Sequence, residues 1–140
     1  MKIQELLDNY KSLSFEQKLA EAKVAFADLG ARMQEAGYSP KDVKDFATML
    51  VRLASGADKH ASEQELDLFE KATGIDTDEY EFFSMNKRAG EEAFVSAIDE
   101  IVDSFGFGAK EAALRFVALF FVADNELSPK EEQLLARLEA

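Results

Sequence analysis

Apolar side chains recur at steps of three and four residues along most of the chain, which is the spacing of one face of an α-helix. The clearest stripe consists of Phe15, Leu19, Ala22, Phe26, Leu29 and Met33. No stretch shows the strict alternation of a half-buried β-strand. The pattern predicts an all-α fold of about eight helices, over residues 2–10, 14–36, 39–55, 62–73, 76–83, 91–105, 109–123 and 128–138.

Residues that start and stop helices separate these stripes. Ser14 precedes Gln17 by three positions, as in a capping box, and Ser39-Pro40 combines an N-cap with proline at the first helical position. Ser55-Gly56 is expected to end the helix that begins there. The connections are short, which favours antiparallel neighbours in a helical bundle.

The run from Ala112 to Ala123 is almost wholly apolar. It is interrupted by Arg115 and is shorter than the ~20 residues that cross a bilayer, so we interpret it as a buried core helix. We expect a single domain, 1–140, in which the helix at 2–10 lies at the periphery.

A short motif occurs twice, each time between one helix and the next. Ala-Asp-x-x-x-Ser-x-x-Glu spans 57–65 and again 123–131, with an offset of 66 residues at every matching position. The constant offset indicates that a helix–turn–helix unit was duplicated. We therefore predict a bundle of two related halves that pack about a pseudo-twofold axis.

The repeated motif has one interpretation that needs no ligand. Ser62 with Glu65, and Ser128 with Glu131, have the spacing of a capping box, in which the serine accepts from a first-turn amide and the glutamate reaches back to the cap. The aspartates of the motif would then be ordinary turn formers.

A second interpretation is a site for a hard cation. An aspartate beside a helix C-terminus faces the negative end of the helix dipole, so its presence in both copies needs another reason. Carboxylate and carbonyl oxygens suit Ca²⁺ or Mg²⁺. If the halves pack face to face, the converging ligands would be Asp58, Glu65, Asp124 and Glu131, with Glu126 as a further donor. The motifs are not EF-hand loops, because they lack the glycine at position six and the glutamate at position twelve.

The duplicated motif, in an acidic and all-helical chain, resembles the TerB-like (tellurite-resistance protein B) family. The resemblance covers roughly residues 15–140. In that family the turn usually begins Asp-Gly, an apolar residue follows, and the acids are thought to form a metal-binding surface. Carried over by position, these acids are Asp58 and Glu65 in the first copy, and Asp124 and Glu131 in the second.

The second copy matches the family pattern better than the first. Where the family has glycine after the aspartate, this chain has Lys59 and Asn125, and asparagine tolerates the left-handed conformation more readily. The apolar turn residue is Leu127 in the second copy but Ala61 in the first. The resemblance implies a stress-response or regulatory role, without implying tellurite resistance itself.

The charge of the chain excludes some partners. The formal net charge is −12, and residues 45–105 carry 5 basic and 15 acidic side chains. This field repels phosphate backbones and anionic lipid, so we expect neither nucleic acid nor a membrane as a partner. The alternative to a cation site is therefore a metal-free interaction module whose acidic surface binds a basic protein partner.

The sequence offers no candidate catalytic centre. There is no cysteine, and His60 is the single histidine, which we interpret as a solvated turn residue. No Ser-His-Asp set or glycine-rich phosphate loop is present, so we expect a non-enzymatic protein without an organic cofactor. The first residues lack the apolar core of a signal peptide, which favours a cytoplasmic location.

Overall fold

The computed structural model of the chain describes residues 3–58, 63–75, 91–123 and 129–137. These residues form helices without any strand, which confirms the all-α prediction. The helix expected at 76–83 lies outside the described residues. The helices are α1 (Ile3–Lys11), α2 (Phe15–Glu35), α3 (Pro40–Asp58), α4 (Glu63–Thr73), α5 (Glu91–Phe105), α6 (Phe107–Phe121) and α7 (Pro129–Arg137).

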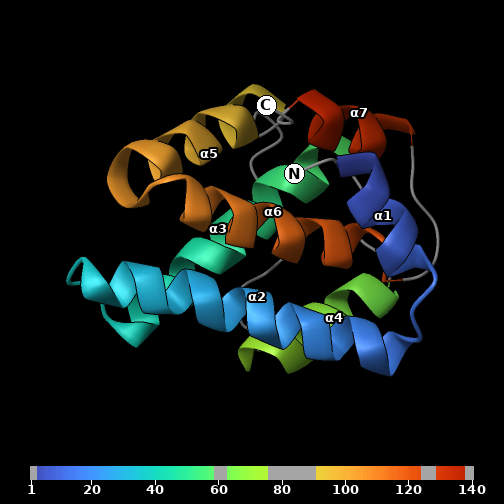
Figure 1. Cartoon of the computed structure of the whole chain (residues 1–140), viewed down its shortest axis with the longest axis horizontal. Helices are drawn as coiled ribbons and strands as arrows, with labels where there is room; N and C mark the ends of the chain where they lie inside the picture. The colour runs from blue at the N-terminus through green and yellow to red at the C-terminus, as the bar shows by residue number, and fades with distance from the viewer. Residues whose placement is uncertain (1–2, 59–62, 76–90, 124–128, 138–140) are drawn as a thin grey trace.

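Helix α6 lies at the centre of the bundle and packs against all the other described helices (Figure 1). Its phenylalanines join the core: the ring centroid of Phe116 lies 5.9 Å from that of Phe26 on α2 and 6.2 Å from that of Phe69 on α4. Phe116 is fully buried. The interpretation of the apolar run as a core helix is therefore confirmed. Among the described helices, none combines the length and apolar character needed to cross a bilayer.

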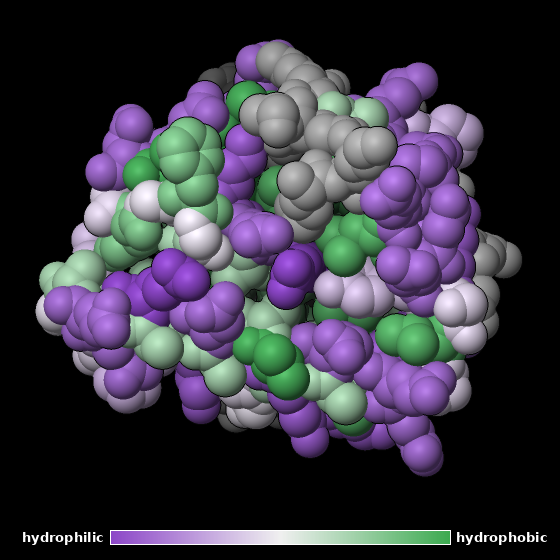
Figure 2. Space-filling view, viewed as in Figure 1, coloured by the Kyte–Doolittle hydropathy of each residue, from purple (hydrophilic) through white to green (hydrophobic). Residues whose placement is uncertain are grey.

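Apolar residues reach the surface only in separate patches on the face drawn in Figure 2, between hydrophilic side chains that occupy most of its edge. The large apolar side chains that are most exposed are Val24, Tyr38, Met49 and Phe107. Most apolar residues of the stripes predicted from the sequence thus face the interior of the bundle.

Two of the predicted helix starts have the expected capping bonds. At the start of α2 the Ser14 amide donates to the Gln17 side chain at 2.9 Å, and the Gln17 amide donates to the Ser14 hydroxyl at 3.1 Å. At the start of α3, Ser39 and Asp42 exchange the same two bonds at 3.0 and 3.1 Å. Capping therefore fixes where both helices begin.

The predicted end of α3 at Ser55-Gly56 is wrong, because the helix continues to Asp58. A glycine inside a helix costs only about 1 kcal/mol relative to alanine, which packing can outweigh. Upstream of it, Leu50 and Val51 are fully buried and hold the helix in the core. The motif aspartate thus belongs to the last turn of α3.

The first helix is part of the core. Ile3, Leu7 and Tyr10 are buried, and α1 packs against α6 and α7. Its apolar face therefore lies against α6 and α7. Burial raises the pKa of the Tyr10 hydroxyl, an effect that nearby Arg115 opposes and Glu21 reinforces.

Asp42 is expected to link stability to acid pH. Hydrogen bonds from the Ser39 amide and then from its hydroxyl lower the pKa of the Asp42 carboxyl in the folded protein. A lowered pKa contributes stability above the unfolded-state value of about 3.9, which is lost as pH falls through the folded-state value. Denaturant melts should show Asp42→Asn less stable than the wild type at pH 7, with the difference shrinking below pH ~4. A difference that stays constant down to pH ~2 would contradict this linkage.

Candidate functional site

The structure buries two glutamates at the same place in two helices. Glu65 is the third residue of α4 and Glu131 is the third residue of α7. Their exposed fractions are 3% and 5%. They are the glutamates of the two sequence motifs and lie 66 residues apart, as do the first residues of their helices.

Their burial distinguishes these glutamates from the capping residues of the other helices. Gln17 and Asp42 occupy the same third position in α2 and α3, make capping-box bonds, and are exposed. Capping alone therefore does not require burial. Taking a carboxylate out of water is costly unless it is paired, hydrogen-bonded or bound to a metal, and both glutamates interact with other groups of the fold. Their burial at equivalent positions of two helices makes Glu65 and Glu131 the candidate functional side chains.

The two glutamates belong to different corners of the bundle. Helix α4 packs against α2 and α6, whereas α7 packs against α1, α3 and α6. Figure 1 shows α4 and α7 on opposite sides of α6. The described helices therefore favour two separate corners over one shared cluster.

The other proposed ligands cannot be placed in these corners. Asp58 ends α3, but its side chain lies outside the described residues, as do Asp124 and Glu126 altogether. Within 3–58, 63–75, 91–123 and 129–137, no three His, Cys, Asp or Glu side chains form a group that could hold a metal ion. The convergence of the five carboxylates thus stays a prediction.

Lys18 is a buried charged residue that the sequence analysis missed. It is 1% exposed, and its Nζ donates to the carbonyl oxygen of Val122 at 2.8 Å. Val122 is the C-cap of α6, where carbonyls lack helical partners and a cation is favoured. The lysine thereby joins the start of α2 to the end of α6, directly before the second acidic motif. The available signal was its spacing with Ala22 and Ala25, which places it on the buried face.

The repeat extends beyond the acidic motif to the buried faces of the helices. At the same offset of 66 residues, buried apolar residues match between α3 and α6 and between α4 and α7. The matching pairs are Val43 and Ala109, Ala47 and Ala113, Leu50 and Phe116, Val51 and Val117, and Phe69 and Leu135. Helices α3 and α6, and helices α4 and α7, thus use corresponding positions for the core.

Comparisons of the chain with protein-family models, with curated proteins and with solved structures gave no match. The resemblance to the TerB-like family therefore rests on the duplicated motif.

Proposed function

We propose that this protein is a non-enzymatic TerB-like domain whose two Asp-x₆-Glu corners bind a divalent cation, Ca²⁺ or Mg²⁺. The observation that supports the proposal is the burial of Glu65 and Glu131 at equivalent positions of α4 and α7. Carboxylate oxygens at these two equivalent positions are ligands that suit both ions. A stress-response or regulatory role follows from the family resemblance alone.

The packing of the helices suggests how the ligands would be grouped. We define the first half as α2, α3 and α4 and the second half as α5, α6 and α7, related by the proposed pseudo-twofold axis. Because α4 packs against α6, Glu65 would act with Asp124 and Glu126, which follow α6 in the chain. Because α7 packs against α3, Glu131 would act with Asp58. Each cation would then join a helix start in one half to a helix end in the other.

Thermal melts with and without CaCl₂ or MgCl₂ test this proposal. A site with a Kd of about 1 mM, at about 10 mM cation, should stabilise the folded state by about 1.4 kcal/mol. For a chain of this size such a gain raises Tm by roughly 3–5 °C. Glu65→Gln and Glu131→Gln should each reduce the rise, because amide oxygens are weaker ligands than carboxylates.

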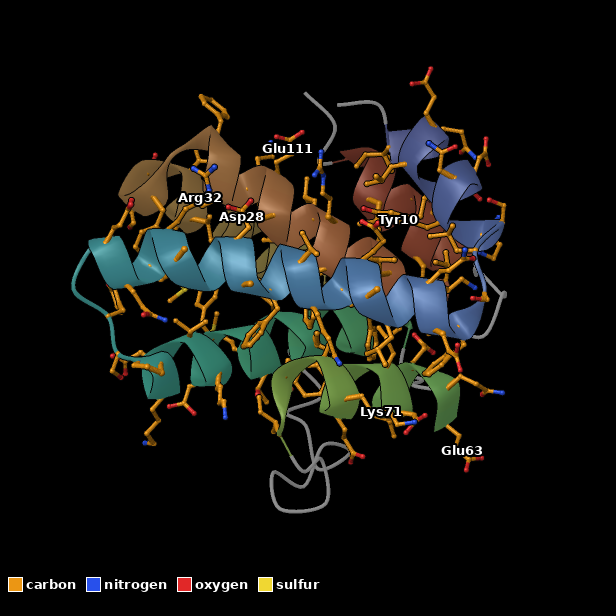
Figure 3. All side chains as sticks on the ribbon, turned by 60° about the horizontal axis from the view of Figure 1, so that its bottom comes forward. Tyr10, Asp28, Arg32, Glu63, Lys71 and Glu111 are labelled. Atoms are coloured by element: carbon orange, nitrogen blue, oxygen red, sulfur yellow. The ribbon has the colours of Figure 1, made fainter. Side chains whose placement is uncertain are left out.

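The matched controls are Glu63→Gln on α4 and Glu132→Gln on α7. Glu63 is exposed and its side chain points away from the bundle (Figure 3), while Glu132 is half-buried beside Glu131. Both controls should keep the full rise in Tm. An equal loss of the rise in the controls would indicate general charge screening, and no rise in the wild type at millimolar cation would reject the cation site.

The second candidate function is a metal-free interaction module for a basic protein partner. It is favoured by exposed aromatic residues at one end of the bundle, where Phe107 is 73% exposed and the rings of Tyr38 and Phe105 meet edge-on at 5.4 Å. Exposed Asp103 lies on the last turn of α5, two residues before Phe105. Aromatic faces and carboxylates together attract arginine-rich surfaces. The cation titration separates the two candidates, because only the cation site predicts a rise in Tm.

A further inference from the structure

A hollow with a volume of about 320 Å³ lies between α2 and the first turns of α3. Figure 3 shows these two helices side by side. The hollow is lined mainly by apolar residues, namely Phe26, Ala27, Gly30, Ala31, Pro40 and Val43. Gln34 and Lys44 supply its polar lining. We call it the α2–α3 groove.

Small residues on α2 create this groove. A Cβ atom at Gly30 would lie 3.3 Å from Cγ1 of Val43, so the absence of a side chain there lets α3 approach α2 closely. Ala27 and Ala31 are exposed and line the groove, and their small side chains leave it open to solvent. Phe26 and Val43 provide the apolar floor, with Val43 almost fully buried.

One charged side chain, that of Lys44, lines the groove. Lys44 is exposed and one helical turn beyond Pro40, the first residue of α3. The N-terminal end of a helix carries partial positive charge, which adds to that of the lysine, although Asp42 offsets part of it. An apolar floor beside a cationic wall is complementary to a molecule with an aliphatic tail and an anionic head.

We propose that the α2–α3 groove binds a medium-chain aliphatic carboxylate, with its tail on Phe26 and Val43 and its carboxylate on the Lys44 ammonium group. Octanoate, which has a short aliphatic tail and one carboxylate, is a suitable probe of this class. This site is separate from the two glutamate corners and does not depend on cation binding.

Titration of the ¹⁵N-labelled full chain with sodium octanoate, followed by amide chemical shifts, tests the proposal. Saturable shifts are expected at residues 27–34 and 41–44, with 1-octanol binding more weakly than octanoate. Lys44→Met should weaken octanoate binding about two- to fivefold, because an exposed ion pair contributes little more than this. The same substitution should leave 1-octanol binding unchanged.

Two further variants complete the test. Ala31→Phe places a large side chain in the groove from an exposed helical position, and it should abolish octanoate shifts while Tm stays near the wild-type value. Lys41→Met is the matched control, because Lys41 is exposed on α3 but does not line the groove. The proposal is overturned if octanoate gives no saturable shifts in the groove, if 1-octanol binds as tightly, or if Lys41→Met weakens binding as much as Lys44→Met.

Discussion

Replacing Phe116 with alanine is expected to lower the free energy of unfolding by about 3–5 kcal/mol, the range observed for large-to-small substitutions of buried aromatic residues. Phe116 is fully buried on the central helix, and its ring packs between Phe26 and Phe69. Truncation would leave a cavity where α2, α4 and α6 meet. Urea denaturation at 25 °C measures the loss.

Phe107→Ala is the matched control for this substitution. Phe107 has the same side chain on the same helix, but 73% of it is exposed. Its replacement should change the free energy of unfolding by no more than about 0.5 kcal/mol, as for most surface substitutions. Similar losses in the two variants would contradict the placement of α6 at the centre of the core.

Lys18→Met is expected to lower the free energy of unfolding by about 1.5–3 kcal/mol, the range for a hydrogen bond to a charged group. Methionine keeps the aliphatic stem but removes the ammonium group that donates to the Val122 carbonyl. That carbonyl ends α6 inside the protein, where water cannot readily replace the lost donor. Urea denaturation again provides the measurement.

The control for the lysine substitution is Lys23→Met. Lys23 is exposed and lies five residues further along α2. It should leave the stability within about 0.5 kcal/mol of the wild type. An Lys18→Met variant as stable as this control would show that the buried ammonium group does not hold α2 to the end of α6.

Much of the fold could be predicted from the sequence because helix periodicity and capping are local properties. The capping serines Ser14 and Ser39 begin α2 and α3 as expected. Gly37 and Gly74 adopt positive φ directly beyond α2 and α4, where left-handed backbone favours glycine. Each of these signals depends on neighbours within a few positions, so no knowledge of the tertiary packing is needed.

The depth of burial along α2 could not be fixed in the same way. Of the predicted stripe, Ala22, Leu29 and Met33 are buried, whereas the larger Phe15, Leu19 and Phe26 are partly buried and pack against the core. Ala25, which lies outside the predicted stripe, is also buried. Helices approach most closely where small side chains face each other, and large ones then flank the contact. Hydrophobicity alone ranks phenylalanine above alanine, so it identifies the face of α2 that meets the core but not which positions on that face are most deeply buried.

The candidate site was predictable as a motif but not as an arrangement. The offset of 66 residues identified Glu65 and Glu131 as equivalent, and nothing local distinguished them from exposed capping residues such as Asp42. Their burial depends on which helices cover α4 and α7, which is set by contacts distant in sequence. The same holds for Lys18, whose partner Val122 is 104 positions away.

The packing of α4 against α6 has a consequence for how the chain folds as it is synthesised. The Phe69 side chain on α4 packs on the rings of Phe116 and Phe120, which emerge from the ribosome roughly fifty residues later. Until then the part of the Phe69 ring that packs on α6 stays uncovered in the nascent chain. We therefore expect stable co-translational folding to wait for α6, with chaperones competing for the uncovered surface in the interval.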